Sequence, residues 1–313
     1  MRLRTGRPDL SRYADLFDVP ARVTEAPGLS VTFLGVSTLL IEDGRTAILT
    51  DGFFSRPSML PVLLGRLAPD PDRIDACLER AGITALEAVL PVHSHFDHAL
   101  DSAYVADRTG AVLVGGESTA NIGRGHGLPA ERVVVAVPGE EIDLGPFTVT
   151  LVESHHCPPD RYPGAITEPL RPPARVGAYR CGEAWSILVG HESGRTVLVQ
   201  GSAGYVEGAL AGHSAEVAYL GVGQLGLQDE DYVTAYWDQT VRTVGARRAV
   251  LTHWDDFFRP LPGISGAGPL RALPYAGDDL DATMAVLSRL AERDGVTLSF
   301  PTVWRREDPW APA

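Results

Sequence analysis

Three histidines and one aspartate fall within the six residues His-Ser-His-Phe-Asp-His at positions 93–98. This segment follows the apolar run at 86–92, which predicts a buried strand. His93 and His95 are two residues apart, so in extended backbone their imidazoles project to the same side. Neutral imidazole and carboxylate groups are ligands that suit zinc, iron and manganese. The spacing therefore predicts a metal site at a strand end rather than a His-rich surface loop.

The composition is that of an ordinary globular chain and excludes some functions. The 313 residues are 44% hydrophobic and 21% charged, enough for one large α/β domain with a substantial core. The net charge of −13 argues against a nucleic-acid or anionic-membrane partner, because such proteins carry a basic face. We expect no signal peptide and no membrane span, since no apolar run has the required length.

Three cysteines bear on the compartment. Cys77, Cys157 and Cys181 are odd in number and far apart in the sequence. They do not have the pattern of a disulfide framework, which favours a reducing, cytoplasmic location.

Strand and helix patterns indicate α/β layering around a mixed sheet. Short β-type runs separated by turn residues predict an antiparallel meander at 30–35, 38–42 and 46–50. Further strands are predicted at 111–114, 133–137, 147–153, 184–191, 195–200, 216–222, 248–252 and 296–300. Helical patterns occur at 70–81, 99–108, 118–126, 229–244 and 279–293.

The His-x-His-x-Asp-His segment after a strand resembles the metallo-β-lactamase superfamily. The resemblance implies an α/β fold, the four-layer αββα sandwich, as a single domain over 1–313. Residues 1–28 would be an N-terminal arm. Residues 53–83 would be an insertion whose apolar half is either core or a lid beside the metal. The family carries one or two metal ions at one end of its two sheets.

The resemblance also implies ligands far along the chain, at strand ends. One set would consist of three imidazoles, those of His93, His95 and His156. The other would combine a carboxylate with two imidazoles, namely Asp97, His98 and His253. Asp97 and His98 would also be the catalytic residues. His156 is chosen over its neighbour His155 because relatives use the last histidine of such a strand end, although both remain candidates. Asp51 would hydrogen-bond the ligand loop instead of binding metal.

Ser202 is the main departure from the family pattern. Many members have an aspartate at this position, and its carboxylate bridges two metals. A bridging carboxylate neutralises charge between two cations about 3.5–4 Å apart. Because a hydroxyl does not, we expect weaker binding of the second metal. A single metal, a water-bridged pair and a site completed by substrate all stay open.

The His-Trp-x-x-Phe segment at 253–257 resembles the branch containing ascorbate-6-phosphate lactonase and N-acyl-phosphatidylethanolamine-hydrolysing phospholipase D. This implies a small ester, lactone, amide or phosphodiester as substrate, with one or two Zn²⁺, or Mn²⁺ or Fe²⁺ on the same ligands. Asp255 or Asp256 is a candidate for a further ligand. The Pro-rich loop 158–178 is expected to wall the substrate site, with Arg161 available to an anionic group.

Three functional hypotheses follow from these features. The first is a metal-dependent hydrolase that activates water, with Asp97 as proton acceptor if only one metal is present. The second is a biosynthetic enzyme that uses the metal as a Lewis acid without hydrolysis. The third, motivated by Ser202, is a catalytically weak metal-binding or ligand-binding protein. A homo-oligomer is possible in each case.

Overall fold

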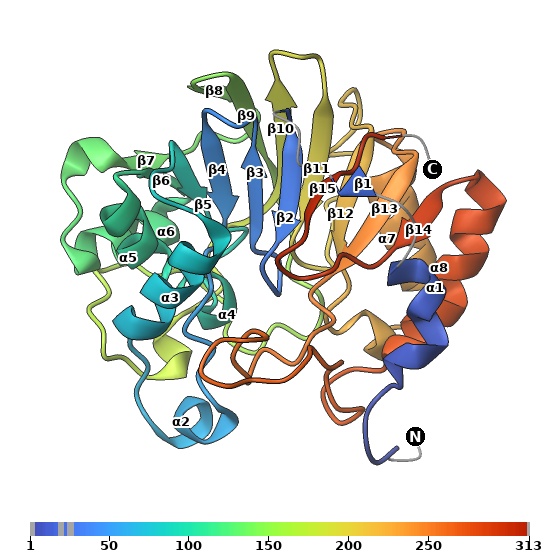
Figure 1. The fold of residues 1–313 in the computed structure, drawn as a ribbon, viewed down its shortest axis with the longest axis horizontal. Helices are drawn as coiled ribbons and strands as arrows, with labels where there is room; N and C mark the ends of the chain where they lie inside the picture. Colours follow the sequence, from blue (N-terminus) through green and yellow to red (C-terminus); the bar gives the residue numbers. More distant parts are fainter. Residues whose placement is uncertain (1–3, 18–21, 24–27, 312–313) are drawn as a thin grey trace.

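Two β-sheets packed face to face form the centre of the protein, with helices on both outer sides (Figure 1). The computed structural model describes residues 4–17, 22–23 and 28–311. The predicted four-layer α/β sandwich is confirmed. Within the described part of the chain, no helix is both long and apolar enough to cross a membrane.

The first sheet has eight strands and begins with the predicted meander. Its order is β1 (Arg22–Val23), β15 (Arg306–Asp308), β2 (Ser30–Phe33), β3 (Leu39–Glu42), β4 (Ala47–Thr50), β5 (Ala88–Leu90), β6 (Val112–Gly115) and β7 (Val133–Val135). Strands β2 to β4 pair antiparallel, and β4 to β7 pair parallel. The carboxyl ends of β4 and β5 therefore meet at one edge.

The second sheet has seven strands and is also mixed. Its order is β14 (Thr297–Ser299), β13 (Arg248–Thr252), β12 (Val217–Gly221), β11 (Thr196–Gln200), β10 (Ala184–His191), β9 (Phe147–Ser154) and β8 (Glu141–Leu144). Strands β11 to β14 are parallel, and β10 is antiparallel to both β9 and β11. Strands β9, β11 and β13 consequently end at the same edge.

Alternation along the strands creates the two cores. In β3, Leu39 and Ile41 belong to the core between the sheets, whereas Leu40 faces the helices on the other side. This is the period-two pattern of a strand buried on both faces. Each buried leucine or isoleucine removed from water contributes about 1.5–3 kcal/mol.

Helices lie outside the two sheets, and some of them have capping residues at both ends. The helices are α1 (Ala14–Phe17), α2 (Met59–Leu64), α3 (Pro71–Ala81), α4 (Phe96–Ala99), α5 (Ser102–Thr109), α6 (Glu117–His126), α7 (Glu230–Trp237) and α8 (Leu280–Asp294). At the start of α3, the Asp70 carboxylate accepts the Arg73 N–H at 3.2 Å, and Gly82 ends the helix in a left-handed conformation. Aspartate and glycine are favourable residues at these N-cap and C-cap positions.

Several element predictions were wrong in their bounds. Residues 141–144 are strand β8 rather than part of a turn. The helix expected at 229–244 is α7 followed by a π-helical turn at Asp238–Arg242. The helix expected at 99–108 is split into α4 and α5. Strand β15 was missed, because three charged residues have little intrinsic strand preference and pair only through tertiary context.

The N-terminal arm packs on the body in its described part. Phe17 stacks on Phe300 with ring centroids 5.1 Å apart and meets Trp254 edge-on at 5.7 Å. Residues 1–3, 18–21 and 24–27 of the predicted arm lie outside the described residues.

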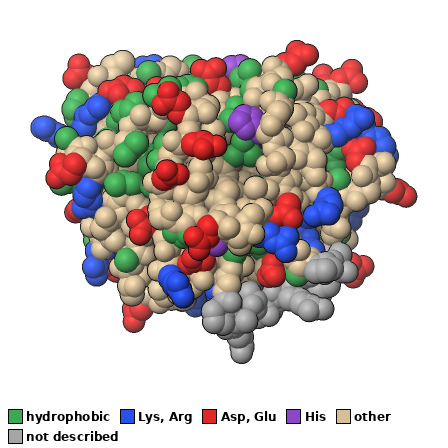
Figure 2. Space-filling model, turned by 90° about the horizontal axis from the view of Figure 1, so that it is seen from above, with side chains coloured by type: hydrophobic (Ala, Val, Ile, Leu, Met, Phe, Trp, Pro, Cys, Tyr) green, Lys and Arg blue, Asp and Glu red, His purple; other side chains and the backbone are tan. Residues whose placement is uncertain are grey.

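Charge is mixed over the surface. Figure 2 shows acidic side chains spread over one end of the molecule, with basic side chains interspersed and no continuous basic patch on that face.

Candidate metal centre

Three imidazoles converge where β5 and β9 end. His93 Nε2 lies 3.1 Å from His95 Nδ1, and the ring of His156 lies 5.0 Å and 4.7 Å from those of His93 and His95. Each residue offers one ligand atom, and these atoms all lie within 4.8 Å of one another. We call His93, His95 and His156 the first ligand set.

A carboxylate and two further imidazoles gather beside the first set. Asp97 Oδ2 lies 3.5 Å from His253 Nε2 and 3.8 Å from His98 Nε2. Asp97, His98 and His253 form the second ligand set, again with ligand atoms within 4.8 Å of one another. The rings of His93 and His98 are 4.0 Å apart, so the two sets adjoin.

Asp51 holds the ligand loop from the end of β4. One carboxylate oxygen accepts the Val92 N–H at 2.9 Å, and the other lies 2.8 Å from His98 Nδ1. With the proton on Nδ1, the lone pair of His98 Nε2 faces the second ligand set. That buried Nε2 has no hydrogen-bond partner among the described residues. A metal ion would satisfy it, so these residues fit the cation that the resemblance implies.

Burial and neighbouring charges shift the pKa values of His93 and His98 in opposite directions. Burial lowers the pKa of His93 well below its usual range and that of His156 to about 4, so both imidazoles are neutral at neutral pH. Neutral imidazole is the form that binds metal. Burial also disfavours charge on His98, but the Asp51 and Asp97 carboxylates outweigh it and raise the pKa of His98.

Comparison with known proteins bears on this arrangement. The model of the Metallo-beta-lactamase superfamily matches residues 31–171, from β2 into the loop after β9. This part of the chain is therefore similar to the metallo-β-lactamase superfamily. A curated relative, a metal-dependent hydrolase of Heliobacterium modesticaldum, is 26% identical over 107 residues, which are 34% of this chain and 38% of that protein. The matched region is thus well under half of that relative's length.

Solved structures resemble this protein over most of its length. A possible metal-dependent hydrolase from Veillonella parvula has a TM-score of 0.54 at 13% identity, covering 90% of this chain and 99% of its own. CmlA, a diiron β-hydroxylase from Streptomyces venezuelae, has a TM-score of 0.51 at 14% identity, covering 90% and 54%. At such identities the likeness shows the fold alone. The resemblance to a lactonase and phospholipase branch stays a prediction.

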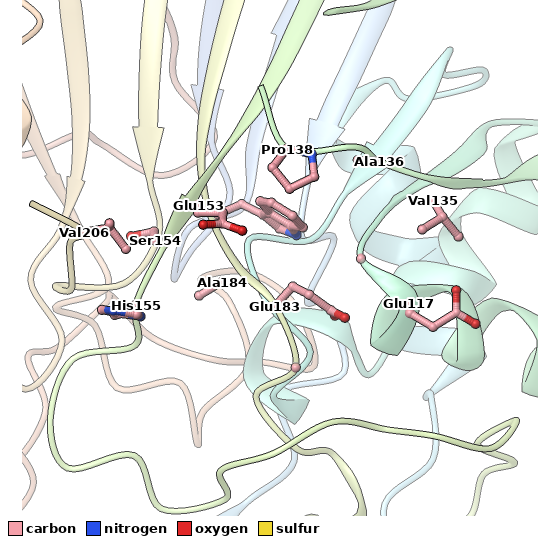
Figure 3. A pocket seen from close by; sticks show the side chains of 13 residues that line it. Glu117, Val135, Ala136, Pro138, Glu153, Ser154, His155, Glu183, Ala184 and Val206 are labelled. Atoms are coloured by element: carbon pink, nitrogen blue, oxygen red, sulfur yellow. The ribbon is translucent and has the colours of Figure 1, made fainter. Parts of the chain in front are cut away.

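The adjacent histidines His155 and His156 face different pockets. His155 is exposed and lines a cavity of about 410 Å³ together with Glu117, Glu153 and Glu183, whereas His156 joins the first ligand set. Figure 3 shows the side chains of Glu153, His155 and Glu183 around that cavity. Glu183 also accepts the Ser118 N–H at 3.1 Å near the start of α6. His156 is therefore the histidine that we carry into the proposal below.

Ser202 supports the strand end that carries His156. Its hydroxyl accepts the Cys157 N–H at 3.0 Å, and it belongs to neither ligand set. The hydroxyl is thus used to hold the loop, at the position where many superfamily members bridge two metals.

Asp255 and Asp256, the candidates for a further ligand, belong to neither ligand set. Asp255 accepts the Val36 N–H at 2.9 Å and pairs with the fully buried Arg56 guanidinium at 2.5 Å. Asp256 pairs with Arg7 at 3.1 Å. Both carboxylates therefore form ion pairs with arginines and hold the segment after β13 in place.

Asp160 is a residue that the sequence analysis missed. Its Oδ1 lies 3.2 Å from His95 Nε2, the ring nitrogen opposite the one that faces His93, and accepts the Tyr162 N–H at 2.9 Å. A carboxylate on the second nitrogen fixes the ring's orientation and tautomer. The available signal was its position four residues after His156, in the loop already expected to wall the site.

A pocket of about 170 Å³ opens beside the ligand sets. Arg161, Tyr162 and Val176 line it from loop 158–178, so this loop forms a wall of the pocket as expected. Apolar side chains from α2 and from the segment after β13 complete it, namely Val62, Leu63, Phe257 and Phe258.

Proposed function

We propose that this protein is a metal-dependent hydrolase of a small ester, lactone, amide or phosphodiester, with zinc as the first cation to test. The observation that carries the proposal is the pair of adjoining, largely buried ligand sets beside a pocket. The match of residues 31–171 to the Metallo-beta-lactamase superfamily and the hydrolase name of the curated relative support it.

Both a bound cation and the protein's own side chains would contribute to the chemistry expected at this centre. A cation held by these ligands activates water near neutral pH and polarises a carbonyl or phosphoryl oxygen. Asp97 lies between His98 and His253. It would serve as a ligand when both sets are filled, or as the proton acceptor when only the first set is filled. Asp51 keeps His98 in the required tautomer, and Arg161 meets an anionic part of the substrate.

A second candidate is a biosynthetic reaction at the same centre without hydrolysis. Ser202 favours it, because a site lacking the bridging carboxylate leaves more positive charge to polarise a bound substrate. Reaction in ¹⁸O-labelled water separates the two candidates, since only hydrolysis incorporates the label into product.

The first experiment is elemental analysis of native protein, His95→Ala and Ser202→Asp after incubation with excess zinc, manganese or iron. We expect His95→Ala to lose metal, and to lose activity across a panel of esters, lactones and phosphodiesters. His213→Ala is the matched control, because this histidine lies outside both sets. Full metal content and activity in His95→Ala would refute the assignment. A second equivalent of metal only in Ser202→Asp would indicate a native single-metal centre.

We further propose a single domain in a reducing, cytoplasmic setting. One hydrophobic core spans both sheets, which supports a unit that folds together. Cys77, Cys157 and Cys181 are all buried and unpaired, which supports the reducing compartment.

A further inference from the structure

Helix α2 turns an apolar face to solvent next to the ligand sets. Met59, Leu60, Leu63 and Leu64 are 48%, 66%, 66% and 78% exposed. They are four of the seven large hydrophobic side chains exposed in the described part of the chain. Figure 1 shows α2 projecting beyond the edge of the sandwich where the ligand-bearing strands end. Such a concentration of exposed apolar groups marks a binding surface rather than ordinary packing.

Hydrogen bonds hold the segments before and after α2 in place, although the outer face of the helix is exposed to solvent. Before the helix, the buried Asp101 carboxylate accepts the N–H groups of Phe54 and Ser55 at 2.8 Å and 2.6 Å. After it, Leu67 and Ala174 exchange backbone hydrogen bonds of 2.7 Å and 2.9 Å. The second contact ties α2 to the loop that carries Arg161. The apolar face is therefore presented by a fixed frame.

The apolar face is continuous with the metal pocket. Val62 and Leu63 of α2 line the same cavity as residues of both ligand sets, and Phe257 and Phe258 line it too. At about 170 Å³ this cavity is smaller than the roughly 300–1,000 Å³ of ordinary ligand sites. It accommodates a head group, so the rest of a larger ligand has to lie over the rim, where α2 exposes its leucines.

Arg161 supplies a positive charge at the same rim. It is the sole lysine or arginine lining the pocket, and its guanidinium makes no ion pair with any described residue. A guanidinium without a carboxylate partner is suited to bind a carboxylate or phosphate in two-point fashion.

We propose that the substrate is an anionic amphiphile. Its reactive head lies at the ligand sets, its acidic group meets Arg161, and its alkyl chain lies along α2 against Leu63 and Phe258. This inference rests on the proposed function and adds the class of substrate. The occupant of the α2 face is the chain of a single substrate molecule.

The test uses binding rather than turnover, so that it remains informative if the hydrolase proposal fails. Zinc-loaded protein is titrated calorimetrically with n-alkylphosphonic acids from methyl to decyl. We expect each added methylene to tighten binding about threefold to fourfold until the chain passes the end of α2. Equal affinity along the series would overturn the proposal.

Substitutions on α2 and at the rim locate the effect. Leu63→Asp, at a side chain that is 66% exposed, should flatten the dependence of affinity on chain length while metal content stays unchanged. Val137→Asp is the matched control, because this residue is 52% exposed and lines none of the metal pocket. Leu63→Ser is the milder variant should the aspartate disturb folding. Arg161→Gln should weaken every member of the series by a similar factor, about tenfold.

Two further outcomes separate the alternatives. Sedimentation with phosphatidylcholine vesicles, lost in Leu63→Asp and combined with a flat phosphonate series, would assign α2 to a lipid surface and overturn the proposal. Chain-length-dependent binding without turnover of any ester, lactone or phosphodiester would refute the hydrolase while retaining the ligand class.

Discussion

Asp51 directly follows β4 and holds the ligand loop in place with its carboxylate. Its two oxygens engage the Val92 N–H and His98. Replacing a carboxylate behind a ligand imidazole lowers metal affinity about 10–100-fold in comparable sites. We expect Asp51→Asn to lose zinc to a competing chelator at correspondingly lower chelator concentration. Asp143→Asn, on the exposed face of β8, is the control and should titrate like the native protein. An unchanged chelator midpoint in Asp51→Asn would remove this residue from the metal centre.

The buried ion pair between Arg56 and Asp255 joins two elements that are far apart in sequence. Both side chains are fully buried, and Arg56 also donates to the Arg259 carbonyl at 2.6 Å. Removing one partner of such a pair leaves a buried charge without compensation, at a cost of about 3–5 kcal/mol. Arg56→Met should lower the free energy of unfolding by this amount in urea.

Adding Asp255→Asn to Arg56→Met should recover part of that loss. The asparagine still accepts the Val36 N–H but carries no charge. Additive losses from the two substitutions would show that the pair does not act as a unit.

Strand β15 introduces a pH-dependent element into the first sheet. Burial raises the pKa of Glu307 from 4.5 to about 7, although Arg305 and Arg248 oppose the shift. The folded protein therefore keeps a proton that the unfolded chain releases between pH 4.5 and 7, and stability falls as pH rises through this window. Glu307→Gln should be more stable than native protein at pH 8, by up to about 3 kcal/mol, and nearly equal at pH 4.5. Urea unfolding at both pH values checks this, and an equal difference at both would contradict it.

Metal binding should stabilise the whole molecule. The ligand sets draw on the segments that follow β5, β9 and β13, so they connect both sheets. A cation at 100 times its dissociation constant adds about 2.7 kcal/mol to the folded state. Chelation should therefore lower the melting temperature by several degrees. His95→Ala should show no such shift and His213→Ala the full one. An equal melting temperature of native protein with and without chelator would contradict a native-state metal site.

The parts of the fold and site that could be predicted from sequence are those with local patterns. Period-two strands, the capped helix α3 and the His-rich loop each carry their signal within about ten residues. Asp160 and the pair of Arg56 with Asp255 depend on segments that meet only in three dimensions. The exposure of α2 could not be predicted either, because its leucines have the same sequence pattern as core residues. The ligand roles of both sets stay a prediction until metal is measured.

The position of β15 between β1 and β2 bears on how the chain is made. Strand β2 is synthesised well before its outer neighbour, which consists of residues 306–308. Until those residues are made, one edge of β2 presents unpaired backbone groups, and such an open edge can pair with other nascent strands. Truncation shortly before residue 306 would leave that edge permanently open.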